Sequence, residues 1–264
     1  TLPEGEEAVV VLDRSPAYGE SGGQVGDQGM IVTEEEEETV FEFGDVKKEK
    51  GFMLHVGKLV KGGLNVGDEV RCLVDKETRM ATARNHTATH LLHFALRQVL
   101  GEHARQAGSH VSPERLRFDF ANPNELSPEQ RLEIEDIVNA KIMEDEPVAT
   151  TKMGLSEARE AGAMALFGET YGDIVRVVSA GDFSRELCGG THCQRTGQVG
   201  LFRIVSEGSV ASGVRRIEAV TGTGALARLR EREEQVTEVC KLVGAQENNV
   251  VERTQAVLDQ VRDL

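Results

Sequence analysis

The chain has 264 residues, 39% of them hydrophobic, which is enough for two ordinary domains with a substantial core. Its formal net charge of -15 argues against broad, non-specific binding to nucleic acid, because phosphate contacts need positive surface, although a local basic site is compatible with it. No apolar run approaches the roughly 20 residues that cross a bilayer, and no signal-peptide pattern is present, so we expect a soluble cytoplasmic protein without a membrane partner.

The first predicted domain covers residues 1–76 and is expected to be a small β-barrel. Short β-rich runs alternate with glycine clusters, and no helical pattern lies between them. The glutamate run at 34–38 is predicted to be a solvated turn. The predicted strands lie at residues 9–12, 30–32, 40–43, 52–56 and 70–74.

The second predicted domain covers residues 77–221 and has an α+β pattern. Its clearest local signal is a capping box formed by Ser127 and Gln130, with Pro128 at the first helical position. The region is expected to place helices on one face of a mostly antiparallel sheet. Helices are predicted over residues 79–100, 128–144 and 156–167, and strands over residues 116–120, 174–178, 201–206 and 214–220.

The third predicted segment, residues 222–264, is purely helical and is expected to lead to a further C-terminal domain. Apolar residues recur at alternating three- and four-residue steps, with Glu233 interrupting the series. This pattern suits a helix packed on its own domain, a helix that pairs with a second copy in a homodimer, or one that contacts a missing neighbour. Because the sequence begins with Thr1, we expect a fragment of a larger protein.

The first candidate ligand pair is His86 and His90 in "RNHTATHLLHFAL". Residues four apart on a helix project from one face, so both imidazoles can share a metal ion. The pair alone is a weak signal. Thr87 stands where the H-E-x-x-H protease motif has its glutamate, which argues against a zinc hydrolase acting on peptides.

The second candidate pair is Cys188 and His192 in "SRELCGGTHCQRTG", where two glycines permit a tight turn. The four cysteines of the chain are scattered, which favours metal or catalytic use over a disulfide framework. Two helical histidines with a cysteine and a histidine from a turn suit tetrahedral Zn²⁺. Cys193 is an alternative ligand, and His93 is interpreted as a lining or core residue.

Four separated motifs resemble the editing region of bacterial alanyl-tRNA synthetases. They are "YGESGGQVGDQG", "RNHTATHLLHFALRQVLGEHARQAGSHVSPERLRFDF", "ELCGGTHCQRTGQVGLFRI" and "GVRRIEAVTG". This region is shared with free-standing AlaX trans-editing proteins and is more distantly similar to the editing domain of threonyl-tRNA synthetases. The resemblance covers nearly the whole chain, without the aminoacylation domain.

The resemblance implies a site that hydrolyses tRNA(Ala) wrongly charged with serine or glycine. The family's zinc ligands fall on His86, His90, Cys188 and His192. Its editing residues fall on Thr89 and Gln106, and its glycine-rich motif, credited with supporting editing, falls on residues 20–27. Four protein ligands would fill a tetrahedral shell, so either one ligand, such as His192, is loosely bound or zinc only organises the site.

Two alternatives remain on the sequence alone: a free-standing AlaX-type deacylase and a non-catalytic, zinc-stabilised tRNA-binding module. A local grip on the tRNA acceptor end is expected from arginines of the middle region. These are Arg84, Arg97, Arg105, Arg115, Arg117, Arg203, Arg215 and Arg216.

Overall fold

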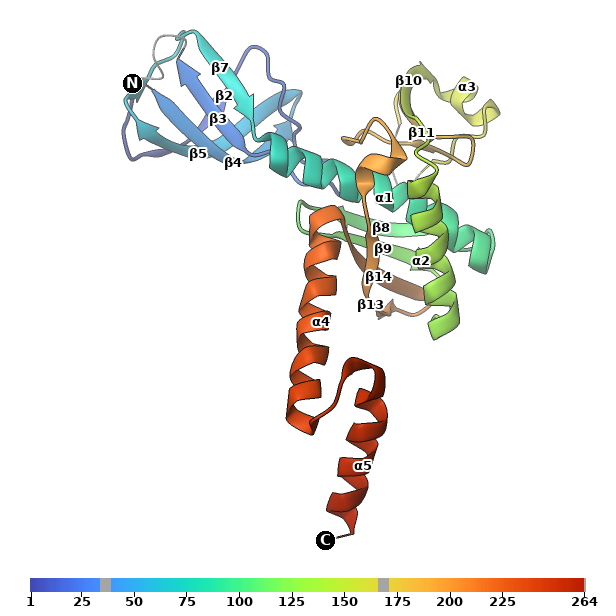
Figure 1. Ribbon diagram of the computed structural model, residues 1–264. Coiled ribbons are helices and arrows are strands. Elements are labelled where there is room, and N and C mark those ends of the chain that lie inside the picture. Colours follow the sequence, from blue (N-terminus) through green and yellow to red (C-terminus); the bar gives the residue numbers. More distant parts are fainter. Residues whose placement is uncertain (34–38, 166–170, 264) are drawn as a thin grey trace. The chain divides into compact units, whose positions relative to one another are not determined.

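The computed structural model describes residues 1–33, 39–165 and 171–263 (Figure 1). It confirms a mixed α+β class with antiparallel sheets. The chain divides into two compact units, Thr1–Gly222 and Thr223–Leu264. The finer division at residues 76 and 221 stays a prediction, and the turn predicted at 34–38 lies outside the described residues.

The N-terminal part holds one five-stranded antiparallel sheet in the order β2-β5-β4-β3-β7. Ile31, Phe41, Phe43 and Leu59 fill the core on its inner face. The predicted closed barrel is not confirmed, because within the described residues β2 and β7 are the edge strands of the sheet and do not pair with each other. A separate two-stranded sheet is formed by β1 and β6. The strands are β1 (Leu2–Pro3), β2 (Glu7–Val11), β3 (Gly29–Thr33), β4 (Val40–Glu49), β5 (Phe52–Lys61), β6 (Gly63–Leu64) and β7 (Val70–Val74).

Helix α1 (Lys76–Leu100) confirms the long helix predicted at residues 79–100. Asp75 caps its start by accepting a hydrogen bond from the backbone N–H of Thr78, as helix N-termini require. The helix ends at Gly101, whose φ of 106° a residue with a side chain would rarely adopt. Much of α1 is buried, and residues such as Leu91 and Leu92 belong to the largest hydrophobic core described.

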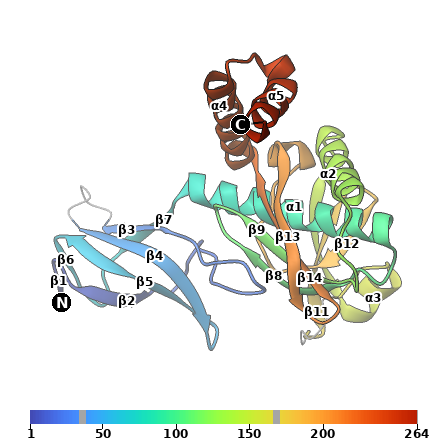
Figure 2. The same cartoon turned by 90° about the horizontal axis from the view of Figure 1, so that it is seen from below.

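A four-stranded antiparallel sheet, ordered β13-β14-β9-β8, packs against α1 and α2 and is separate from the N-terminal sheet (Figure 2). Phe118, Phe120 and Ile217 supply much of the sheet's buried face. The predicted capping box of Ser127 and Gln130 is present at the start of α2. The elements are β8 (Gln106–Val111), β9 (Leu116–Ala121), α2 (Pro128–Met143), β13 (Phe202–Ala211) and β14 (Val214–Thr221).

A small three-stranded sheet, ordered β10-β11-β12, brings the turn that carries Cys188 and His192 towards α1. The helix predicted over residues 156–167 is wrong in length, because α3 ends at Glu160 and Gly162 follows with a φ of 78°. Strands β8, β10 and β12 were not predicted. The elements are β10 (Val148–Gly154), α3 (Leu155–Glu160), β11 (Ile174–Ala180), β12 (Ser184–Leu187) and the 3₁₀ turn η1 (Thr196–Val199).

The C-terminal unit consists of α4 (Gly222–Val243), a 3₁₀ turn η2 (Glu247–Asn249) and α5 (Val250–Arg262). Several apolar side chains of the two helices are exposed. Pairing with a second copy stays a prediction. Among the described residues, no helix combines the length and apolar character that a membrane span needs. The exposed apolar residues include Leu229, Val239, Leu242, Leu258 and Val261.

Candidate metal centre and adjoining cavity

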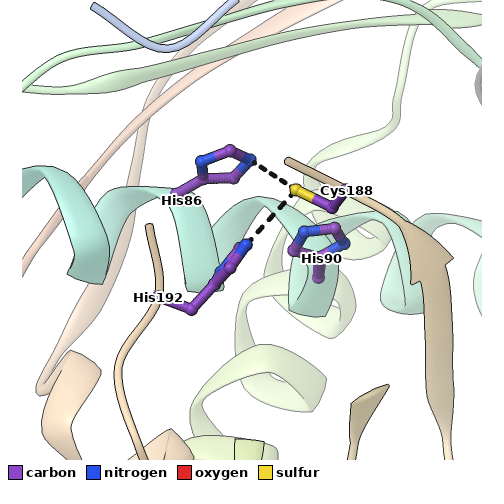
Figure 3. A group of neighbouring side chains, drawn as sticks. All are labelled: His86, His90, Cys188 and His192. Atoms are coloured by element: carbon purple, nitrogen blue, oxygen red, sulfur yellow. Dashed lines mark hydrogen bonds between the residues drawn. The ribbon is translucent and has the colours of Figure 1, made fainter. Parts of the chain in front are cut away.

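The two predicted ligand pairs meet at one point. His86 and His90 lie one turn apart on α1 with their rings stacked at an interplanar angle of 2°, and Cys188 and His192 belong to the turn after β12. One ligand atom from each residue lies within 4.8 Å of all the others (Figure 3). The histidine pair of α1 and the Cys188–His192 pair of the turn therefore form one cluster, although the two pairs are about a hundred residues apart in the sequence.

The donor atoms of the cluster suit a metal ion. The Sγ atom of Cys188 lies 3.3 Å from Nε2 of His86 and 3.3 Å from Nε2 of His192. Nε2 of His90 is buried and has no hydrogen-bond partner among the described residues. Buried polar atoms are rarely left without a hydrogen-bond partner. An unpaired imidazole nitrogen in this position therefore fits a metal ion bound at the centre of the cluster. Nitrogen and sulfur donors of this kind suit Zn²⁺.

Each imidazole of the cluster is held on its far side by another residue. A second hydrogen bond at Nδ1 fixes the ring orientation and directs Nε2 towards the centre, as at known metal sites. The three contacts differ in chemistry: one is an amide, one a carboxylate and one a hydroxyl. They are Gln24 Oε1 to His86 at 2.6 Å, Glu186 Oε2 to His90 at 2.9 Å and Thr87 Oγ1 to His192 at 3.3 Å.

Gln24 connects the glycine-rich motif of the N-terminal part to the cluster. Its Oε1 also accepts the backbone N–H of Thr191 at 2.8 Å, and its Nε2 donates to the Thr191 hydroxyl at 3.0 Å. The side chain is completely buried. Sequence reasoning singled out residues 20–27 only through the family resemblance, and it assigned no contact to Gln24. Glu186 was missed altogether, although it stands two residues before Cys188.

Two glycines are needed for close approach. A Cβ on Gly190 would lie 2.0 Å from Cε1 of His86, so any side chain here would displace that ring. A Cβ on Gly23, whose φ is 81°, would lie 2.4 Å from the carbonyl oxygen of Ser109. Gly189 and Gly190 do not adopt positive φ values, so the metal-site turn needs Gly190 for space rather than for a left-handed backbone.

The ionisation of the cluster favours a thiolate. Burial alone would raise the pKa of Cys188, but the charge on His86 and hydrogen bonds from His192 outweigh it and hold that pKa well below the ordinary value. Burial and the charge on His86 lower the pKa of His192 to about 3. Burial would also lower the pKa of His90, yet the Glu186 carboxylate raises it to about 10. A metal ion that bound Nε2 of His90 would take the place of a proton on that atom and leave Nδ1 protonated towards Glu186.

A cavity of about 250 Å³ adjoins the cluster. His86, His90 and Cys188 form part of its wall, and the predicted editing residues Thr89 and Gln106 line it as well. The Thr89 hydroxyl donates to the backbone carbonyl of Asn85 at 2.9 Å, and Gln106 Nε2 donates to Ser109 Oγ at 3.2 Å. The oxygen of Thr89 therefore keeps its lone pairs for accepting a hydrogen bond.

A larger hollow of about 980 Å³ lies on the N-terminal sheet and is lined by residues such as Val9, Met30 and Val56. None of the cluster residues lines it. Although this hollow is larger, no histidine or cysteine is among the described residues that line it, so it offers no candidate metal ligand of these types. The smaller cavity is the one where polar groups and perturbed pKa values converge.

Two neighbouring candidates do not join the cluster. Cys193 is buried in the hydrophobic core, and burial raises the pKa of its thiol, so it behaves as a core residue. His93 is also buried, and its Nδ1 lies 3.0 Å from Glu186 Oε1. The metal cluster within the described residues consists of the four residues that the sequence predicted, and their role as ligands stays a prediction.

Most of the arginines expected to contact tRNA form hydrogen bonds or ion pairs with other residues of the chain. Arg84 donates to the backbone carbonyl of Gln198. Arg105, next to Gln106, is exposed, and its backbone is hydrogen-bonded to His103 and Ala121, whereas its side chain has no hydrogen bond or ion pair among the described residues. The other six lie beside carboxylates: Arg97 beside Glu102, Arg115 beside Glu218, Arg117 and Arg216 beside Asp119, Arg203 beside Glu135, and Arg215 beside Glu207.

The sequence matches two family models over parts of the chain and known proteins over almost all of it. Residues 175–218 match the threonyl and alanyl tRNA synthetase second additional domain, and residues 1–78 match class II (A) tRNA synthetases. Alanine–tRNA ligases of Pseudomonas fluorescens, Pseudomonas entomophila and Pseudomonas syringae pv. tomato are 54%, 53% and 52% identical to the chain over 99%, 100% and 99% of its length. The chain spans 30% of the length of each of these relatives.

Proposed function

The chain is homologous along its whole length to one segment of alanine–tRNA ligases, and from this premise we propose that it is the editing part of such an enzyme. It would act in the cytoplasm and hydrolyse the ester bond of Ser-tRNA(Ala) and Gly-tRNA(Ala). The observation that carries the proposal is the convergence of two histidines of α1 with Cys188 and His192 beside a polar cavity. Editing is needed because one synthetic pocket separates near-isosteres by only about 1–3 kcal/mol.

Zn²⁺ is the metal that we propose for the cluster, held by His86, His90, Cys188 and His192. When bound, it would supply Lewis acidity, either by lowering the pKa of a water molecule or by polarising the ester carbonyl. His192 has the longest supporting contact of the three imidazoles, 3.3 Å to Thr87. We therefore infer that His192 is the ligand most easily displaced if the shell has to open.

Selection of serine follows from the hydrogen bonds of the cavity. Because the Thr89 hydrogen is used by the Asn85 carbonyl, the Thr89 oxygen can accept the hydroxyl proton of a seryl group. The alanyl group carries no such donor, so the same contact cannot hold it. Gln106 is kept in place by Ser109 and lines the same cavity, where its amide can support the polar end of the substrate.

The proposal is tested by single-turnover deacylation of Ser-tRNA(Ala), Gly-tRNA(Ala) and Ala-tRNA(Ala), with the zinc content of the protein measured in parallel. We expect Ser-tRNA(Ala), whose hydroxyl the Thr89 oxygen can accept, to decay at least about tenfold faster than Ala-tRNA(Ala), and the Gly-tRNA(Ala) rate shows whether a substrate without a hydroxyl is also hydrolysed. Equal decay of all three would contradict an editing site. Zinc binding without any deacylation would instead identify a non-catalytic, zinc-stabilised tRNA-binding module.

Arg105 is the cation that we propose for contact with the tRNA acceptor end, because it is exposed, unpaired among the described residues and adjacent to Gln106. Arg105→Gln should weaken tRNA binding and reduce the slope of log K against log salt by about 0.7, the amount expected for one phosphate contact in a single strand. Arg115→Gln is the control, since Arg115 is exposed but lies 3.4 Å from Glu218. Identical salt slopes for wild type and Arg105→Gln would exclude the contact.

A further inference from the structure

Glu186 on β12 is a buried carboxylate for which the proposed reaction has no direct use. The residue is 1% exposed. Its Oε2 accepts a hydrogen bond from Nδ1 of His90 at 2.9 Å, and its Oε1 lies 3.0 Å from Nδ1 of His93. A charge is retained at such depth only when hydrogen bonds and opposite charges compensate its lost hydration. The Nδ1 atoms of the two imidazoles provide hydrogen bonds to its two oxygens.

The carboxylate determines which nitrogen of His90 faces the cluster. An acceptor at Nδ1 keeps the proton on that atom, so a neutral His90 ring presents its Nε2 lone pair on the opposite side. That Nε2 is one of the buried side-chain atoms without a hydrogen-bond partner among the described residues, as is Nε2 of His93. Without the carboxylate, the ring could adopt the other tautomer or rotate, and the donor would no longer face Cys188.

His93 holds the carboxylate itself in place. It lies three residues after His90 on α1, so both rings approach β12 from the same side of the helix. Because Glu186 is fixed through both oxygens, its orientation towards His90 does not depend on one contact alone. The amide of Gln24 and the hydroxyl of Thr87, which support the other two imidazoles, are neutral.

We propose that Glu186 is the positioning residue of the metal centre, and that His93 supports it by holding its second oxygen. Glu186 keeps His90 protonated at Nδ1 and directs Nε2 to the ion. The inference rests on the metal site of the proposed function, but it concerns metal affinity and geometry rather than hydrolysis. Loss of such a supporting hydrogen bond typically weakens metal binding about 10- to 100-fold.

The test compares Glu186→Ala, Glu186→Gln and His93→Gln in the full chain. The Zn²⁺ dissociation constant is measured by competition with a chelator, and the absorption spectrum of the Co²⁺-substituted protein reports the ligand geometry. We expect Glu186→Ala to raise the dissociation constant about 10- to 100-fold and to shift the Co²⁺ bands. Glu186→Gln, which keeps one acceptor oxygen, and His93→Gln, which leaves Glu186 in place, should have smaller effects.

Glu135→Gln is the matched control, because Glu135 is also buried and paired, with Arg203 at 2.7 Å, but lies outside the cluster. It should leave the Zn²⁺ affinity and the Co²⁺ spectrum unchanged. An unchanged Zn²⁺ affinity in Glu186→Ala, or equal losses in Glu186→Ala and Glu135→Gln, would overturn the inference. If Glu186→Ala does not fold, wild-type affinity and spectra in both Glu186→Gln and His93→Gln would overturn it. A wild-type protein that binds Zn²⁺ but hydrolyses no ester would contradict the proposed function and leave this inference intact.

Discussion

Cys188→Ala is expected to abolish stoichiometric zinc binding and to lower the hydrolysis of Ser-tRNA(Ala) by more than about a hundredfold. Cys188 supplies the sulfur of the cluster and, as a thiolate, its negative charge. Loss of a supporting residue alone costs about 10- to 100-fold at metal sites, so loss of a direct ligand should cost more. Metal analysis of the purified protein and single-turnover deacylation would measure the two effects.

Cys193→Ala is the control for this variant. Cys193 is five residues further along and buried, but its thiol packs in the hydrophobic core and does not belong to the cluster. We expect some loss of stability from the missing sulfur, with one zinc per chain and a deacylation rate within about twofold of wild type. A Cys188→Ala protein that keeps both its zinc and its rate would show that the cluster is not the reactive site.

Thr89→Val is expected to slow the hydrolysis of Ser-tRNA(Ala) by about 10- to 100-fold while leaving zinc bound. The substitution keeps the shape of the side chain but removes the oxygen that would accept the seryl hydroxyl, and a substrate hydroxyl left unpaired in a buried site costs about 1–3 kcal/mol. The discrimination between Ser-tRNA(Ala) and Ala-tRNA(Ala) should fall with it. Deacylation rates for the two substrates, measured side by side, give both quantities.

Thr82→Val provides the comparison, because it removes a similar hydrogen bond from the same helix. The Thr82 hydroxyl donates to the carbonyl of Thr78 at 3.0 Å, as that of Thr89 does to Asn85, and Thr82 is buried without lining the cavity. Its rates should stay close to wild type. Similar losses in both variants would point to helix stability instead of substrate selection and would remove Thr89 from the proposed mechanism.

The parts of the fold that the sequence predicted well depend on local signals. The capping box at Ser127 and the apolar spacing of α1 each act within a few residues, and both were confirmed. The convergence of the histidine pair with Cys188 was also anticipated, because the donor types of both pairs suit one ion. These features need no knowledge of how distant segments pack.

The features that the sequence did not predict depend on distant contacts. Gln24 reaches His86 across 62 residues, and Glu186 reaches His90 from a strand that was not predicted. No periodicity marks such pairs, because each is produced by packing between elements. The open edges of the N-terminal sheet have the same origin: strand runs reveal where strands lie but not whether the first and last of them pair.

The hydrogen bonds of Gln24 connect the N-terminal part of the chain to α1, so the two segments depend on each other and would have to be inherited together. The same glutamine holds a metal-site imidazole and the backbone of the turn that carries His192. A gene fusion or a domain transplant that began at the start of α1 would carry all four donor residues yet leave Gln24 behind, and with it its contacts to His86 and Thr191. Recombination during evolution should therefore preserve the join between these two segments, even though each contains its own hydrophobic core.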